Sequence, residues 1–169
     1  GHDLRRSLSV RVSPLSIKKI KDAAKSIRKL FGITQPKVDM GWLLEVLISK
    51  GFVVICEAND PRLVGKYALT YPDQNKILIS EATYDAAVDG DGRARFTIAH
   101  EIGHFFLHKG QMSFARSTDG THKIYEDAEW QADTFASHFL IDDSYLNGSE
   151  SLEYISSLFG TSLQAAKVY

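Results

Sequence analysis

The chain has 169 residues, of which 44% are hydrophobic, and a formal net charge of -1 at pH 7. This length suffices for one domain with a full hydrophobic core, and the single cysteine, Cys56, excludes an internal disulfide and fits a reducing compartment. No apolar run approaches the roughly 18 residues that span a bilayer and no secretory signal pattern is present, so we expect a cytoplasmic protein and exclude a membrane protein.

The charge is unevenly distributed along the chain. Residues 1–30 contain nine Lys or Arg against two Asp, a balance of +7, so the other 139 residues carry -8. A basic segment can bind nucleic acid or an acidic partner. The alternative is the solvated face of an amphipathic helix, which the apolar periodicity of this segment favours.

Two helices are expected first. From Pro14 to Phe31, apolar residues recur at intervals of three and four, which predicts a surface helix. A second helix is expected from about residue 40 to residue 50, with Asp39 as its N-cap and Gly51 just beyond its C-terminus.

Three strands are expected next, at residues 52–57, 65–71 and 76–80, because these runs are rich in β-branched and aromatic residues. The four residues "PDQN" (72–75) predict an antiparallel hairpin between the last two strands. The run "DGDG" (89–92) is then a loop that leads into the next helix.

That helix is expected at residues 93–109 and is apolar nearly all round, so it must be mostly buried. The polar stretch 109–123 has no periodicity and is predicted to be a mobile flap. A further helix is expected at about 125–141, and two short helices follow on either side of Gly160.

Together these elements predict an α+β fold. We expect a mainly helical single domain, residues 3–169, with a small three-stranded antiparallel sheet packed on the helix at 93–109. Within it, residues 3–37 would form a basic N-terminal helical segment, 38–141 the core and 142–169 the C-terminal short helices.

The buried helix contains an unusual polar group. In "FTIAHEIGHFFLH" (residues 96–108), His100 and His104 lie one helical turn apart, so both imidazoles project from one face and can bind one zinc ion. Glu101 is displaced round the helix and could act as general base on a metal-held water. Such a motif arises by chance in roughly one such chain in a hundred, so a third ligand is needed to make it convincing.

Two neighbours of the motif have other expected roles. His108 lies roughly 12 Å along the helix from His100, too far to bind the same ion, and is assigned to packing or to a hydrogen bond with a ligand. Gly103 costs about 1 kcal/mol relative to Ala in a helix, which is tolerated where another element must approach closely.

The helix expected at 125–141 carries two carboxylates, Glu129 and Asp133, on its apolar face. Buried carboxylates need partners. A zinc ion would satisfy Glu129, and the second N–H of a ligand imidazole would satisfy Asp133 and fix the imidazole tautomer. The alternative is that both carboxylates pair with Arg93 or Arg95. The reserve candidates for the third ligand are Glu126 and Asp127.

Two segments resemble the ImmA/IrrE family of small zinc-dependent bacterial peptidases. These are "RARFTIAHEIGHFFLH" (93–108) and "EWQADTFASHFLI" (129–141), which is similar to the family's Glu-x-x-Ala-Asn/Asp-x-Phe-Ala signature. The segments "KILIS" and "ISSLFGTSLQAA" are also similar, so the resemblance extends over about residues 38–166.

The resemblance implies a role for each residue of the group. His100, His104 and Glu129 would be the ligands of one Zn²⁺ per chain, Glu101 the catalytic base and Asp133 the hydrogen-bond partner of a ligand. Manganese is the alternative metal, because this ligand set does not exclude exchange. The residues considered for oxyanion stabilisation are Tyr84, Tyr125 and His122.

The strand at 76–80 would be an edge strand on which an extended substrate adds a further strand. Its residues, Lys76, Ile77, Leu78, Ile79 and Ser80, are therefore candidate substrate contacts. The alternative role is ordinary sheet packing.

The resemblance also implies a narrow-specificity zinc endopeptidase that cuts a separately encoded helix-turn-helix repressor or antitoxin-like partner, and so derepresses stress or mobile-element genes. The alternative is a non-proteolytic module that sequesters a regulator and uses the metal only for structure, against which Glu101 argues. A DNA-binding regulator that uses residues 5–29 ranks below both, and no direct DNA or membrane binding is expected.

Overall fold

The computed structural model describes residues 9–111 and 122–168. These residues fold into α-helices, three strands and short 3-10 turns. The helices are α1 (Ile17–Leu30), α2 (Met40–Ser49), α3 (Glu81–Val88), α4 (Gly92–Leu107), α6 (Ala128–Leu140), α7 (Leu152–Phe159) and α8 (Leu163–Val168). The strands are β1 (Val53–Cys56), β2 (Ala68–Tyr71) and β3 (Lys76–Ser80), and the 3-10 turns are η1 (Pro61–Leu63), η2 (Pro72–Gln74), η3 (Ile124–Glu126) and η4 (Asp143–Tyr145).

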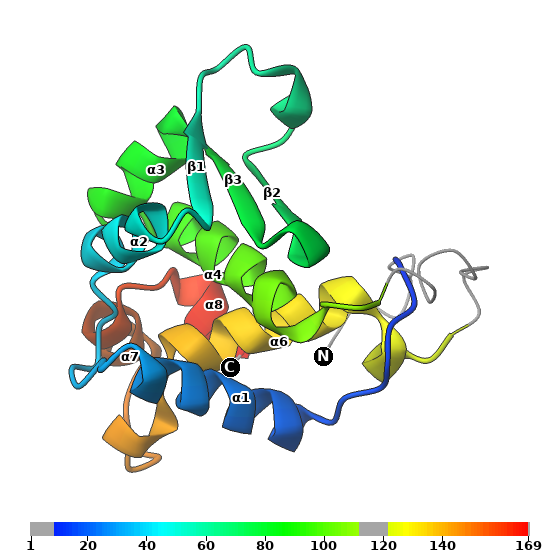
Figure 1. Ribbon diagram of the computed structural model, residues 1–169. Helices are drawn as coiled ribbons and strands as arrows, with labels where there is room; N and C mark the ends of the chain where they lie inside the picture. Colours follow the sequence, from blue (N-terminus) through cyan, green and yellow to red (C-terminus); the bar gives the residue numbers. More distant parts are fainter. Residues whose placement is uncertain (1–8, 112–121, 169) are drawn as a thin grey trace.

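The elements are stacked in layers (Figure 1). The sheet lies on one side of α4, α6 packs along the other side of α4, and α1 packs against the far side of α6. The helix α4 is therefore enclosed between the sheet and α6, which explains why its sequence is apolar nearly all round. None of the helices in the described ranges has the length and apolar character needed to cross a membrane.

The sheet differs from the sequence prediction. Its order is β1-β3-β2, with β1 parallel to β3 and β2 antiparallel to β3, so the sheet is mixed and the prediction of an antiparallel sheet is wrong. The β2–β3 hairpin around "PDQN" is confirmed. Strand patterns indicate which segments are extended but not their order, and β3 inserts between the two strands that precede it.

The position of β3 also corrects the prediction that residues 76–80 form an edge strand. Both sides of β3 are hydrogen-bonded to neighbouring strands, so its main chain has no free groups to offer to a substrate. Its three middle residues, Ile77, Leu78 and Ile79, are all buried. A continuous buried apolar run is typical of a strand covered on both faces, and this signal was present in the sequence.

The helix α3 was not predicted. Ser80 is its N-cap and accepts a hydrogen bond from the main-chain N–H of Thr83, so the chain leaves β3 directly into a helix. The loop expected at 89–92 is shorter than predicted, because α4 already begins at Gly92 with Asp91 as its N-cap.

The other helices were predicted within a few residues. Ser16 caps α1 and Asp39 caps α2, each by accepting a main-chain N–H from the first turn. Apart from the buried Arg28, the basic residues of α1 lie toward its solvent side, and some form ion pairs, such as Lys18 with Asp22, which supports the amphipathic-helix interpretation. The flap predicted at 109–123 falls mainly outside the described residues.

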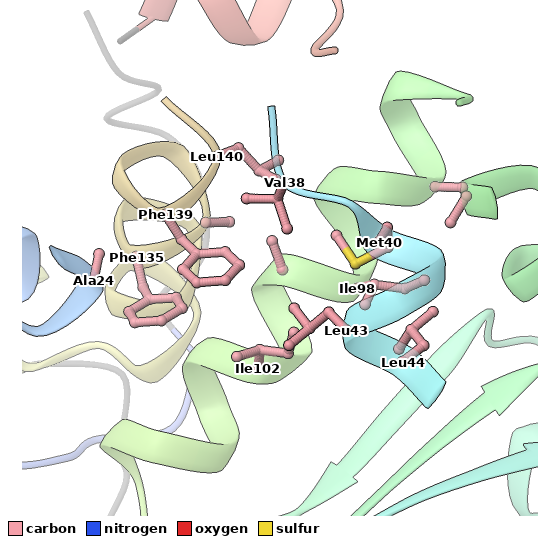
Figure 2. Close-up of a cluster of buried hydrophobic side chains, with 14 of the residues drawn as sticks. Ala24, Val38, Met40, Leu43, Leu44, Ile98, Ile102, Phe135, Phe139 and Leu140 are labelled. Carbon is pink, nitrogen blue, oxygen red and sulfur yellow. The ribbon is translucent and has the colours of Figure 1, made fainter. Parts of the chain in front are cut away.

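The core lies where α2, α4 and α6 meet (Figure 2). Phe135 and Phe139 of α6 stack on each other and face Ile98 and Ile102 of α4. Gly103 lets α6 come close, because a Cβ built on it would lie 3.1 Å from a ring carbon of Phe135. The close approach expected at Gly103 is confirmed, and it sets the separation of the two helices that carry the predicted site.

Two buried arginines connect distant parts of the chain. Arg28 of α1 donates hydrogen bonds to the main-chain oxygens of Phe139 and Leu140 at the C-terminus of α6. Arg95 of α4 donates to the main-chain oxygens of Val38, Phe159 and Gly160 (a residue beyond the end of α7). Each guanidinium thus satisfies several carbonyls that have no helical partner.

Candidate metal centre

The two motif histidines project from α4 toward one point. His100 and His104 lie one helical turn apart, and their Nε2 atoms are 3.1 Å from each other. Within the described residues, ligand atoms of His100, Glu101 and His104 all lie within 4.8 Å of one another. Two imidazole nitrogens that face each other at this distance need a proton or a cation between them.

Glu129, in the first turn of α6, completes the group. Its Oε2 lies 2.8 Å from Nε2 of His100 and its Oε1 lies 3.0 Å from Nε2 of His104. Ligands at ~2.1 Å from a tetrahedral zinc are roughly 3.4 Å apart, so these three side chains fit the ion with a small expansion. Oε2 of Glu101 lies 3.9 Å from Nε2 of His100, and Oε1 of the same carboxylate accepts a hydrogen bond from Thr70, so Glu101 is held beside the three proposed ligands.

Further hydrogen bonds orient the two imidazoles. Oδ1 of Asp133, one turn after Glu129 on α6, lies 2.7 Å from Nδ1 of His100. Nδ1 of His104 lies 2.8 Å from Nδ1 of His108, whose Nε2 lies 2.9 Å from Oε1 of Gln131. A proton on Nδ1 of each motif histidine leaves its Nε2 lone pair directed at the shared point, as metal binding requires.

The charges of the group are mutually stabilised. Burial opposes a positive charge on His100, but hydrogen bonds with Asp133 and Glu129 outweigh it and raise the pKa of His100 to about 10. Burial opposes the charge of Glu129, but the bonds to both histidines hold its pKa well below the usual range. Burial, together with the neighbouring imidazole of His104, lowers the pKa of His108 to about 4.

The alternative partners considered for the two carboxylates are not in contact with them. Arg95 is bonded to main-chain oxygens, and Arg93 is exposed. The reserve ligands are also engaged elsewhere: Glu126 accepts from the main-chain N–H of Lys123, and Asp127 is the N-cap of α6.

Glu101 lies beside the histidines with its side chain largely buried. Its Oε1 accepts a hydrogen bond of 2.7 Å from the hydroxyl of Thr70 in β2. Sequence reasoning missed Thr70, because a single threonine in a strand carries no spacing signal.

The group opens into a cleft of about 450 Å³. One wall is β2 with the residues before it, and another is the N-terminal segment through Val10 and Val12. The residues that line it around the histidines are mainly apolar or small, including Ala68, Leu69, Pro72 and Ala128.

The three residues considered for oxyanion stabilisation do not line this cleft. Tyr84 packs against the core, Tyr125 lines a separate surface groove and the Nε2 atom of His122 bonds to Asp127. Tyr67, which precedes β2, does line the cleft and is exposed, and the sequence contained no pattern that would identify it.

The comparisons with known proteins concern the same part of the chain. A peptidase family model described as the IrrE N-terminal-like domain matches residues 84–168, half of the chain, including α4 and α6. Metallopeptidase ImmA of Bacillus subtilis (strain 168) is 41% identical over 61 residues, 36% of this chain and 34% of that protein. The match therefore spans about a third of the length of this relative. No solved structure matches the chain.

Proposed function

The chain belongs to the ImmA/IrrE family of metallopeptidases, and from this membership we propose that it is a zinc-dependent endopeptidase of narrow specificity. The observation that carries the proposal is the convergence of His100, His104 and Glu129, whose ligand atoms lie 2.8–3.1 Å apart, with Glu101 beside them. Zinc suits this nitrogen and carboxylate set best, and manganese is the alternative.

When bound, zinc lowers the pKa of a coordinated water and polarises the scissile carbonyl. The chain's own residues move the proton. Glu101 accepts a proton from the attacking water and returns it to the departing amine, as a general base that becomes a general acid. Thr70 holds the carboxylate of Glu101 in place, and burial of Glu101 keeps competing solvent from it.

We place the substrate on β2, the sheet edge that lines the cleft. The main-chain N–H of Ser80 bonds to the main-chain oxygen of Tyr67, so in this antiparallel ladder the main-chain groups of Leu69 and Tyr71 also face β3. The main-chain groups of Ala68 and Thr70 then point to the open edge. An extended peptide can pair with them and lie across Glu101.

We propose that the natural substrate is a separately encoded helix-turn-helix repressor or antitoxin-like regulator in the cytoplasm. The resemblance of the two site segments to the ImmA/IrrE family supports this substrate class. A cleft with one free strand edge is consistent with it, because the target must present an extended segment.

The test begins with elemental analysis and then incubates the protein with the regulator encoded beside its gene, read by intact mass. We expect about one zinc per chain in the wild type and in Glu101→Gln, and cleavage by the wild type alone. General base catalysis contributes about 10²- to 10⁴-fold, so cleavage by Glu101→Gln should fall by at least this range.

Glu153→Gln, the same change at an exposed position of α7, is the matched control and should cut normally. Cleavage that survives in Glu101→Gln would contradict the mechanism. A wild type that binds the regulator and never cuts it would instead favour a sequestering module with a structural metal.

A further inference from the structure

Residues 9–13 form a strap across the start of α6, outside the segment that the family model matches. The main-chain N–H of Val12 bonds to the oxygen of Glu126, and the N–H of Ala128 bonds to the oxygen of Val10. The side chains of Val10 and Val12 line the cleft. We call residues 9–13 the N-terminal strap.

The strap is connected to His104 by a chain of hydrogen bonds. The side-chain nitrogen of Gln131 donates 2.8 Å bonds to the main-chain oxygens of Ser13, in the strap, and of Tyr125. The side-chain oxygen of Gln131 then faces Nε2 of His108 at 2.9 Å, and Nδ1 of His108 faces Nδ1 of His104 at 2.8 Å.

In this series of hydrogen bonds, the protons can be donated in one direction only. Two carbonyls fix the amide of Gln131, so its oxygen accepts and His108 must donate from Nε2. One proton lies between Nδ1 of His108 and Nδ1 of His104, and a His104 that offers its Nε2 lone pair to a metal carries this proton on Nδ1 and donates it. The lone pair of His104 Nε2 is left for the metal, which is the tautomer that a zinc ligand needs.

Burial makes these partners hard to replace. Gln131 is 0% exposed and His108 is 6% exposed, so solvent cannot take over a lost hydrogen bond. The strap also reaches the third ligand, because the hydroxyl of Ser9 accepts the main-chain N–H of Glu129 at 3.2 Å and bonds to Oδ1 of Asp127 at 2.9 Å.

We propose that the N-terminal strap is a positioning element of the metal centre, acting on His104 through Gln131 and His108 and on Glu129 through Ser9. Zinc affinity and seating of the strap are then coupled, and by linkage each strengthens the other. The inference rests on the metal site of the proposed function. It adds that a segment outside the catalytic helices controls how tightly this site binds metal.

The first test measures hydrogen exchange of the full chain with and without zinc. The amide of Val12, in the strap, bonds to the oxygen of Glu126, and the amide of Leu15, two residues after the strap, bonds to the oxygen of Tyr125, so both report whether the strap is seated. We expect zinc to slow their exchange. Exchange at both amides that is unchanged by saturating zinc would overturn the coupling.

The second test compares Gln131→Met with Thr134→Val by competition for zinc against a chromogenic chelator. Thr134 is the matched control, because it is on the same helix and its hydroxyl bonds only within the helix, to the oxygen of Trp130. Removing a partner that orients a ligand typically weakens metal affinity about 10- to 100-fold, which we expect for Gln131→Met and not for Thr134→Val. Equal affinity of Gln131→Met and wild type would overturn the proposal.

Unfolding measurements on the metal-free variants show whether Gln131→Met keeps the native fold. If Gln131→Met does not fold, the exchange experiment on the wild type tests the proposed coupling. Neither measurement uses a substrate. A protein that binds zinc and protects its strap but never cuts a regulator would contradict the proposed function and leave the coupling standing.

Discussion

The hydroxyl of Thr70 lies 2.7 Å from Oε1 of Glu101 and 3.1 Å from the main-chain oxygen of the same residue. A hydroxyl has one proton, and the carboxylate, being charged and closer, is the stronger acceptor. This hydrogen bond therefore connects β2, the edge strand beside the cleft, directly to the proposed base Glu101. Pairing of a substrate with β2 would place the scissile bond and Glu101 on one rigid support.

Replacing Thr70 with Val should lower kcat/KM by roughly 10- to 100-fold, because a hydrogen bond to a charged group contributes about 1.5–3 kcal/mol. Thr70→Ser keeps the hydroxyl and should retain most of the activity. Zinc affinity should be the same in both variants, since the hydroxyl of Thr70 bonds to Glu101 and not to a proposed ligand. Peptidase assays and chelator competition measure the two quantities, and equal activity of the two variants would contradict the role of the hydroxyl.

Most of the helices, though not α3, and the residues gathered at the site could be predicted, because their signals are local. Apolar periodicity identifies α1, the N-cap Asp39 helps to identify α2, and the spacing of His100 and His104 on α4 follows from one helical turn. Glu129 and Asp133 could be found because carboxylates on an apolar helix face need partners.

Strand order and single polar contacts could not be predicted in the same way. The position of β3 between β1 and β2 depends on tertiary packing, although its unbroken apolar run indicated burial on both faces. Thr70 and Gln131 belong to no spaced motif. Their contacts with Glu101 and His108 exist only because β2 and α6 pack on α4.

Replacing Asp133 with Asn should weaken zinc binding by about 10- to 100-fold, because the charged acceptor of the His100 Nδ1 proton is lost while the shape is kept. Chelator competition at fixed pH measures the change. Asp85→Asn, the same substitution at an exposed position of α3, should bind zinc as the wild type does. A similar loss in both variants would indicate a general charge effect instead of orientation of His100.

Removing the metal should lower the melting temperature. A ligand present at 100 times its Kd stabilises the native state by about 2.7 kcal/mol, which corresponds to roughly 5–10 °C for a chain of this size. Differential scanning fluorimetry with zinc and then with a chelator measures the shift. His104→Ala should lose the response to zinc, and a full response in that variant would place the bound metal elsewhere.

Acid should weaken the contact between α1 and the η4 turn. Burial opposes the charge of Asp143, but ion pairs with Lys21 and Lys25 outweigh it and lower its pKa to about 2. Because the pKa of Asp143 is lower in the folded chain than its unfolded value of 3.8, the ionised carboxylate stabilises the fold above pH 3.8. This stabilisation is lost as the pH falls through about 2. Asp143→Asn should cost at most about 1 kcal/mol at pH 7, because the pair is partly exposed.

Urea unfolding of the wild type and Asp143→Asn at pH 7 and pH 3 measures this contribution. The difference in unfolding free energy should shrink at pH 3. A difference that grows on acidification would show that the stabilising form of Asp143 is the protonated one.

Replacing Gly103 with Ala tests whether the approach of α6 to α4 is set by this glycine. Alanine improves helix propensity by about 1 kcal/mol, but its Cβ would lie 3.1 Å from the buried ring of Phe135. Overpacking a dense core typically costs about 1–3 kcal/mol, so the net change should be destabilising. A shift of α6 would also carry Glu129 away from the histidines and weaken zinc binding.

Gly41→Ala in α2 is the matched control, because a Cβ there meets its nearest neighbour at an ordinary 3.6 Å and should gain stability from helix propensity alone. Urea unfolding of the metal-free proteins separates the two effects from zinc binding. If both substitutions stabilise the chain equally, contact with Phe135 does not limit the separation of α4 and α6. The fit of the three ligands must then be set by other contacts between these helices.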